Sequence, residues 1–167
     1  MDKGIASSFK KLKSSSKFKE FVVKNKSNYL ASCFKMGDSK LTGSAWQFDF
    51  YAVNSKKMTS FQVGNEITVN KDQEIFAKAG APMELELNRV KIEIKKAMII
   101  ANNYKTEKLP HETVNKEIVI LQELENKPVW NLTLLTSAFN IVNIKIDAFS
   151  GKILSSSCES IMSFKLN

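Results

Sequence analysis

The chain is poor in the residue types on which many enzyme sites and disulfide frameworks depend. Its 167 residues include one histidine, two cysteines, three prolines and six glycines. The only histidine, His111, cannot supply a site that needs several imidazole ligands, and Cys33 and Cys158 lack the paired spacing of a zinc site. Two distant cysteines do not form a disulfide framework either. We therefore expect two strand-borne thiols, with a single bridge between them as the alternative.

Common catalytic and phosphate-binding motifs are also missing. The sequence has no glycine-rich phosphate loop, no HExxH pair and no calcium-binding loop. His111 lies in LPHET, which we interpret as an exposed loop, and any Ser-His-Asp or Cys-His system would have to use it. A carboxylate pair that includes Asp49 stays open, because only the tertiary structure brings such groups together. The sequence predicts no catalytic site, no metal and no cofactor.

Long apolar runs are absent as well. No window approaches the roughly 20 apolar residues that a membrane-spanning helix needs. The first residues, MDKGIASSFKKLKSSSKFKEF, lack the apolar stretch of a secretory signal. We therefore expect a cytoplasmic protein, unless an export signal has been removed.

What the chain does have is lysine, concentrated at the N-terminus. The net charge is +8, and residues 1–26 hold eight lysines against two acidic residues, which leaves +6 there and +2 in the rest. Arg89 is the only arginine, so sequence-specific nucleic-acid recognition, which relies on the bidentate arginine fork, is not favoured. The simplest interpretation is a solvated helix. The alternative is contact with an anionic membrane, nucleic acid or acidic protein through Lys10, Lys11, Lys13, Lys17 and Lys19.

Apolar periodicity predicts mixed helices and strands. A short helix over 4–13 places Ile5, Phe9 and Leu12 on one face, which could contact a membrane or dock on the rest of the protein. The serines at 14–16 then break the helix, so that Ser15 or Ser16 caps a second helix over 17–26, or they form an unstructured joint. Further on, the pattern predicts a helix at about 92–104 and strands at 28–36, 45–53, 58–63, 66–69, 116–124, 129–136, 140–147 and 152–160. In the first strand the alternation places Leu30, Phe34 and Met36 on one face.

The two halves of the chain match each other. AWQFDF and VWNLTL both carry tryptophan at the second position, with apolar residues two and four positions later, as expected of an old duplication. Our first interpretation of Trp46 and Trp130 is packing in the core or between sheet and helix. The second is a ligand groove in which one ring is partly exposed.

One stretch resembles a known family. VWNLTLLTSAFNIVNIKIDAFSGKIL is similar to the C-terminal part of a PepSY domain, which closes on a pattern like V/I-D-A-x-T-G-K-V/I-L. Here that pattern runs from Ile146 to Leu154, with Ser150 where threonine is usual, and the resemblance covers about residues 88–158. The first half keeps the tryptophan strand but lacks this turn. The resemblance implies a cystatin-like fold and a binding or regulatory role, proposed in secreted members to be inhibition of metallopeptidases.

Two residues of that closing turn have expected structural roles. Asp147 can accept hydrogen bonds from backbone N–H groups, and Gly151 can adopt a positive φ. We favour these roles over a catalytic or metal-binding one.

These observations predict an α+β protein with two tandem cystatin-like, PepSY-like units. Each unit is a helix packed on an antiparallel meander of three or four strands. We divide the chain into a basic N-terminal helical segment (1–14), a first unit (15–70), a connector (71–91) and a second unit (92–167). Whether the two sheets pack together or lie side by side stays open, as does the oligomeric state.

The expected function is that of a non-enzymatic binding or regulatory module. Its protein or small ligand would lie on a sheet face or in the groove between the units, near Trp46 or Trp130. The alternative is a peripheral attachment or scaffold protein that contacts an anionic surface through its lysine-rich N-terminal helix.

Overall fold

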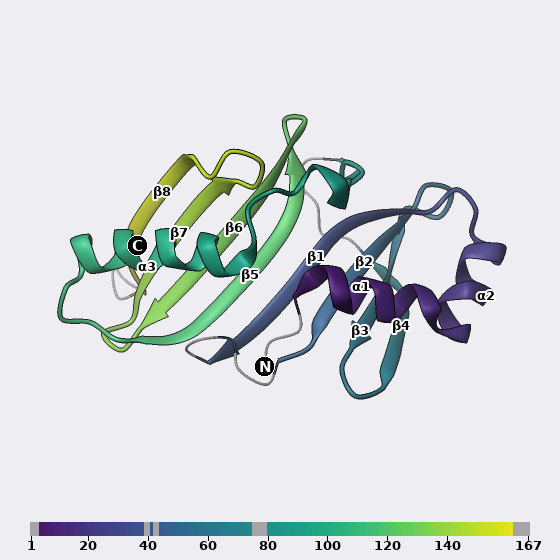
Figure 1. Ribbon diagram of the computed structural model, residues 1–167, viewed down its shortest axis with the longest axis horizontal. Helices are drawn as coiled ribbons and strands as arrows, with labels where there is room; N and C mark the ends of the chain where they lie inside the picture. The colour runs from purple at the N-terminus through teal and green to yellow at the C-terminus, as the bar shows by residue number, and fades with distance from the viewer. Residues whose placement is uncertain (1–3, 39–40, 42–43, 75–79, 162–167) are drawn as a thin grey trace.

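The computed structural model describes residues 4–38, 41, 44–74 and 80–161. Within these ranges the chain forms three α-helices, one 3-10 helix and eight strands (Figure 1). The helical elements are α1 (Ile5–Ser14), α2 (Ser16–Lys24), η2 (Leu87–Arg89) and α3 (Ile94–Lys108). The strands are β1 (Tyr29–Asp38), β2 (Trp46–Ala52), β3 (Lys57–Val63), β4 (Ile67–Glu74), β5 (Val114–Leu124), β6 (Lys127–Thr136), β7 (Asn140–Asp147) and β8 (Ile153–Ser160).

All eight strands form one antiparallel sheet in the order β4-β3-β2-β1-β5-β6-β7-β8. Each half of the chain therefore makes a four-stranded meander, and the meanders join where β1 pairs with β5. The pairing runs from Ser32 opposite Gln122 to Asp38 opposite Lys116. The sequence left open how the two meanders are arranged. They lie edge to edge and form one continuous sheet, because β1 and β5 are hydrogen-bonded to each other. The predicted α+β class with antiparallel strands is confirmed.

The three helices lie on one face of this sheet (Figure 1). α1 lies against β2 and β3, and α3 lies against β6 and β7. The core beneath them is continuous from one half to the other, since Leu12 of α1, Cys33 of β1, Leu121 of β5 and Ala97 of α3 are all fully buried in one cluster. The cross-strand register explains this continuity, because Cys33 lies opposite Leu121 across the junction and both side chains point to the helices.

The predicted break between two N-terminal helices is confirmed. The side chain of Ser15 accepts a hydrogen bond from the backbone N–H of Phe18 at 3.3 Å and so caps α2. The break turns Phe18 and Phe21 toward the sheet, where their rings lie 5.4 and 5.0 Å from the ring of Phe61 between centroids. The two helices thus cover adjacent parts of the same meander.

The expected basic segment at 1–14 contains α1, which packs on the sheet. Among its described residues, Leu12 is fully buried and Ile5 packs against the core. The ring of Phe9 lies 5.2 Å from that of Phe48 on β2 between centroids. Of the two interpretations of this apolar face, the contacts are those of a helix docked on the rest of the protein.

The described parts of the expected connector at 71–91 contact the sheet. Its first residues belong to β4, which continues to Glu74. Leu85 is buried, and its N–H donates to the carbonyl of Leu30 at 2.8 Å. The helix expected at 92–104 instead runs from Ile94 to Lys108 and ends just before Pro110.

We predict that replacing the cap of α2 weakens the fold. Ser15→Ala removes the acceptor for the Phe18 N–H and should lower the free energy of unfolding by about 1 kcal/mol in urea denaturation. Ser14→Ala is the matched control, because that hydroxyl donates only to the Lys10 carbonyl one turn earlier. Equal losses in the two variants would contradict the capping role.

Candidate functional site

Both tryptophans lie inside the molecule. Trp46 is 1% exposed and Trp130 is fully buried, and their ring centroids are 6.3 Å apart. The first interpretation from the sequence, packing in the core, therefore describes both rings. Neither ring is partly exposed, as the alternative of a ligand groove expected, although Trp130 contributes to the wall of a hollow described below.

The two indole N–H groups differ in their partners. Trp130 Nε1 donates to the carbonyl of Ile92 at 2.8 Å, just before α3. Trp46 Nε1 is buried and has no hydrogen-bond partner among the described residues. The ammonium of Lys35, a buried side chain on β1, lies 5.5 Å from the centroid of the Trp46 ring.

Two of the five candidate lysines have structural contacts. Lys11 Nζ donates to the carbonyls of Gly64 and Asn65 at 2.6 and 3.0 Å, and Lys17 Nζ donates to the carbonyl of Ile67 at 2.7 Å. Both lysines thus fasten the N-terminal helices to the β3–β4 hairpin. All five lysines are exposed, and the ammonium of Lys13 lies 5.1 Å from the Phe9 ring centroid.

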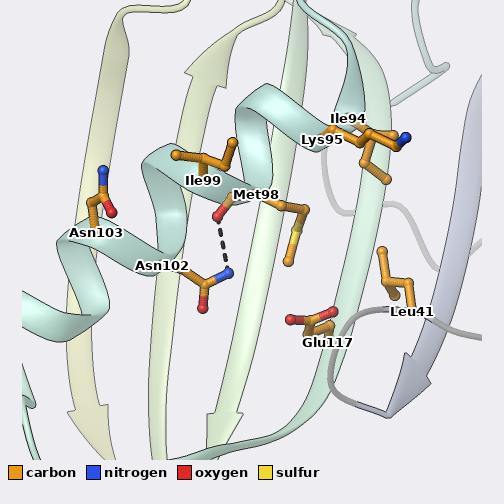
Figure 2. Close-up of a pocket in the computed structure, with 8 residues that line it drawn as sticks. All are labelled: Leu41, Ile94, Lys95, Met98, Ile99, Asn102, Asn103 and Glu117. Carbon is orange, nitrogen blue, oxygen red and sulfur yellow. Dashed lines mark hydrogen bonds between the residues drawn. The ribbon is translucent and has the colours of Figure 1, made fainter.

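One hollow lies where the two halves meet, beside α3. It has a volume of about 440 Å³ (Figure 2). Met98 reaches down from α3 toward Glu117 on β5, and Leu41, from the segment after β1, lies beside that carboxylate (Figure 2). The lining residues are Leu41, Ile94, Lys95, Met98, Ile99, Asn102, Asn103 and Glu117.

A second hollow adjoins the first at the first turn of α3, since Ile94 and Lys95 line both. Its volume is about 520 Å³. It lies between the start of α1 and the segment before α3. Its lining residues are Gly4, Ile5, Ala6, Leu87, Val90, Lys91, Ile92, Glu93, Ile94, Lys95 and Trp130. We call the two hollows together the junction groove. Apolar walls with a few polar groups are typical of ligand sites.

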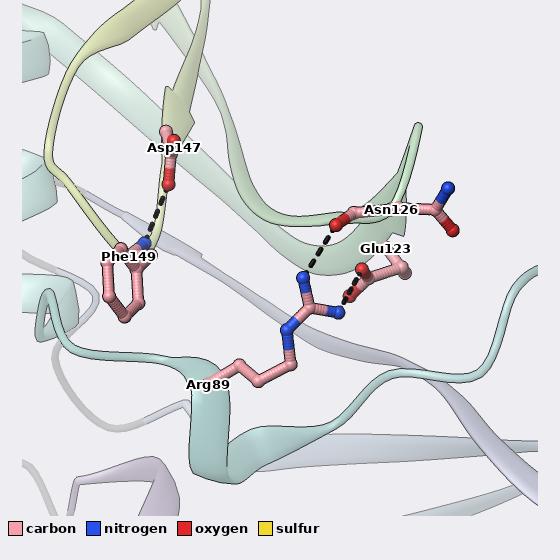
Figure 3. Close-up of polar contacts among 5 residues, drawn as sticks. All are labelled: Arg89, Glu123, Asn126, Asp147 and Phe149. Carbon is pink, nitrogen blue, oxygen red and sulfur yellow. Dashed lines mark hydrogen bonds and ion pairs between the residues drawn. The ribbon is translucent and has the colours of Figure 1, made fainter.

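An ion pair fixes the segment that forms the second hollow. Arg89 of η2 donates from Nη1 to Glu123 Oε1 at 2.7 Å and from Nη2 to the carbonyl of Asn126 at 2.6 Å (Figure 3). The Glu123 side chain is only 2% exposed, so its charge depends on this partner. Sequence reasoning missed Arg89 as an anchor, although it is the only arginine in the chain.

The turn that resembles the PepSY pattern holds the same segment from the other side. Asp147 accepts a hydrogen bond from the N–H of Phe149 at 2.8 Å (Figure 3). It also accepts one from the N–H of Ser150 at 3.1 Å, which confirms its expected role. Gly151 has a φ of 81°, also as expected, and a β-carbon there would lie 3.4 Å from Ile92. The carbonyl of Ala148 accepts from the N–H of Ile92 at 2.8 Å. The turn thus contacts Ile92 through both its backbone N–H and its side chain.

The chemistry-bearing residues that the sequence singled out do not come together. His111 is exposed in the turn after α3, and Cys33 and Cys158 are unpaired thiols on β1 and β8. Asp49 accepts hydrogen bonds from Ser32, Gln47 and Ser60, so its partners are neutral groups rather than a second carboxylate. Within the described ranges, no group of three or more His, Cys, Asp and Glu side chains is placed to hold a metal ion.

Comparisons with known proteins identify the fold and no family. No protein-family model matches the chain, and no curated protein matches it. A crystal structure of a "putative lipoprotein" from Clostridium difficile 630 matches with a TM-score of 0.52 at 15% identity, over 86% of this chain and 90% of that one. This likeness concerns the fold alone. None of the helices in the described ranges is long and apolar enough to cross a membrane.

We predict that the two tryptophans differ in their contribution to stability. Trp130→Phe leaves the buried Ile92 carbonyl without its indole donor, whereas Trp46→Phe removes a donor that has no partner among the described residues. Trp130→Phe should therefore lower the free energy of unfolding by about 1–3 kcal/mol more than Trp46→Phe. Denaturant unfolding of both variants measures the difference. A larger loss for Trp46→Phe would contradict the assignment.

We also predict a pH dependence from Asp147. Burial alone raises the pKa of this carboxyl, but the hydrogen bonds from Phe149 and Ser150 outweigh burial and hold the pKa below its ordinary value. The stabilisation is complete above the unfolded pKa of about 3.9 and is lost as the pH falls through the lower, folded pKa. Asp147→Asn should unfold more easily than wild type at neutral pH, and the gap should close in acid. A pH-independent gap in chemical denaturation would argue against this cause.

Proposed function

We propose that this chain is a non-enzymatic binding module whose ligand occupies the junction groove. The observation that carries this proposal is the pair of adjoining, largely apolar hollows along α3, between the two halves of the sheet. The segment before α3 is held by Arg89, by Trp130 and by the carbonyl of Ala148, so this wall of the groove is formed before a ligand arrives. A groove that exists in advance spares the ligand the cost of ordering it.

We further propose that the halves are tandem PepSY-like, cystatin-like units. Each half has a helix on the same face of the sheet followed by a four-stranded meander, with α1 over β2 and β3 and α3 over β6 and β7. The symmetric strand order and the adjacent pair Trp46 and Trp130 support this proposal. α2 is an addition in the first unit.

The lining of the groove favours a ligand with an apolar body and a polar end. Met98, Ile94 and Leu41 offer apolar contact, while Lys95 and Asn102 lie at the same hollow. An acyl chain, or the side chains of a partner peptide, has this chemistry. Polar groups at the rim fix orientation, and the apolar walls supply most of the affinity.

The groove can be tested by filling it. Met98→Trp places a larger side chain in the first hollow, and Lys96→Trp, on the exposed side of α3, is the matched control. The probe is the apolar dye 8-anilinonaphthalene-1-sulfonate, followed by fluorescence titration. We expect saturable binding to wild type and to Lys96→Trp, and roughly tenfold weaker binding to Met98→Trp, a loss of about 1.4 kcal/mol.

Two outcomes of this titration would reject the groove as the site. One is equal dye affinity in all three proteins, and the other is no saturable binding to wild type. Circular dichroism and thermal unfolding of each variant check that the fold is retained. Capture of ligands from a lysate with wild type and Met98→Trp, followed by mass spectrometry, then identifies the natural ligand class.

The peripheral-attachment alternative is favoured only by the exposed lysines. Lys10 and Lys19 are exposed, whereas Lys11 and Lys17 are engaged with backbone carbonyls. If this surface is functional, Lys10→Glu combined with Lys19→Glu should abolish salt-sensitive binding to vesicles that contain an anionic lipid. Met98→Trp should leave that binding unchanged, which separates the two functions.

The cellular location remains a prediction. The structural neighbour is described as a "putative lipoprotein". We propose a cytoplasmic location for this chain, unless an export signal has been removed, and fractionation of the source cells would test it.

A further inference from the structure

The two edges of the sheet are exposed to different degrees. β4 and β8 are the outermost strands of the eight. An outermost strand carries backbone N–H and C=O groups that can pair with another strand, and proteins usually block such edges with charge, proline, bulges or covering elements. The two edges of this sheet can therefore be compared for such protection.

The β4 edge is protected. Its sequence, ITVNKDQE, has three charged residues out of eight. Lys17 of α2 also reaches this strand and donates to the Ile67 carbonyl at 2.7 Å. A strand that approached this edge would meet Lys17, whose ammonium already occupies one backbone acceptor, in a strand whose sequence is richer in charge than that of β8.

The β8 edge has less charge than the β4 edge, and a bulge interrupts its pairing with β7 near Ile153. Its sequence, ILSSSCES, has one charged residue out of eight and no proline, and its first seven residues are all exposed. Ile153 and Leu154 are 45% and 46% exposed, and Phe149, in the turn just before the strand, is 59% exposed. An exposed, nearly uncharged edge strand next to apolar side chains is typical of a strand-pairing surface.

The distribution of charge favours a second copy of this chain as the partner. The helices α1 and α2 hold six lysines and one glutamate, a surplus of +5, while the other residues carry only +3. α1 lies over β2 and β3, near the β4 end of the sheet. Two copies that meet at β8 therefore keep their basic helices at opposite outer ends. Pairing at any other edge would bring these like charges closer together.

We propose that β8 pairs antiparallel with β8 of a second copy, which joins the two sheets into one across a two-fold axis. The chain already contains such a junction in the antiparallel pairing of β1 with β5. A two-fold arrangement uses the same surface on both copies, as symmetric dimers do. The serines at the centre of β8 place no like charges opposite each other.

The first test is the mass of the full chain in solution. Light scattering after size-exclusion chromatography should give about twice the chain mass of 18.8 kDa. Ser155→Lys combined with Ser157→Lys puts like charges on the edge and should weaken association at least roughly tenfold. Thr68→Lys combined with Asn70→Lys makes the same change on β4 and should leave the dimer intact.

The second test locates the contact with a spin label on Cys158. This thiol is exposed, whereas Cys33 is fully buried and does not react in the folded protein. In a two-fold antiparallel pairing the residue at the axis lies opposite its own copy, because opposed residues must point to the same face of the sheet. With the axis at Ser156 or Ser157, the Cys158 residues of the two copies are offset by four or two positions, or roughly 13 or 7 Å along the strands at about 3.3 Å per residue. We expect strong dipolar broadening that disappears in the Ser155→Lys, Ser157→Lys variant.

Three results would overturn the proposal. They are a monomeric wild type across the concentration range, a dimer that survives the β8 substitutions, and a dimer without short distances between the labels. Circular dichroism and thermal unfolding confirm that both lysine variants fold. The dye titration at the junction groove is independent of these outcomes, because the groove and β8 are separate surfaces.

Discussion

The rest of the structure depends on the antiparallel pairing of β1 with β5. Without this ladder the two meanders would be small sheets with separate cores. With it, Cys33 and Leu121 lie side by side, and the apolar cluster continues from beneath α1 to beneath α3. The same pairing brings the segment after β1 close to α3, so Leu41 and Glu117 can line one hollow. The junction groove is therefore a direct consequence of how the halves meet.

The position of α3 depends in turn on the segment just before it. Arg89 ties that segment to the β5–β6 hairpin, Trp130 holds the Ile92 carbonyl, and the turn at 147–151 receives the Ile92 side chain. These contacts come from three places in the sequence. They give a structural reason for both residues of the turn. Asp147 accepts a hydrogen bond from the backbone N–H of Phe149, and Gly151 adopts a positive φ and leaves room for Ile92.

The local features of the fold could be predicted from the sequence, and the long-range ones could not. The apolar periodicity predicted the position of every strand. Ser15 was predicted as a cap of α2, and Asp147 and Gly151 were predicted to stabilise their turn. The alternation of β1 failed, because a bulge between Leu30 and Ser32 sends Phe34 and Met36 to the face opposite the helices and places Lys35 in the core. In the candidate site, only the general place between the units was foreseen, since its lining depends on pairings between distant residues that leave no local pattern.

The β1–β5 ladder also sets an order of events during synthesis. The paired residues Cys33 and Leu121 are 88 positions apart in the sequence (121 − 33). β1 therefore leaves the ribosome long before β5 has been synthesised. Until β5 emerges, the first meander has two edges, and one of them is the strand that later becomes the centre of the sheet. Contacts of such large sequence separation form slowly. A nascent first half therefore presents a temporary strand-pairing surface, and the arrival of β5 removes it.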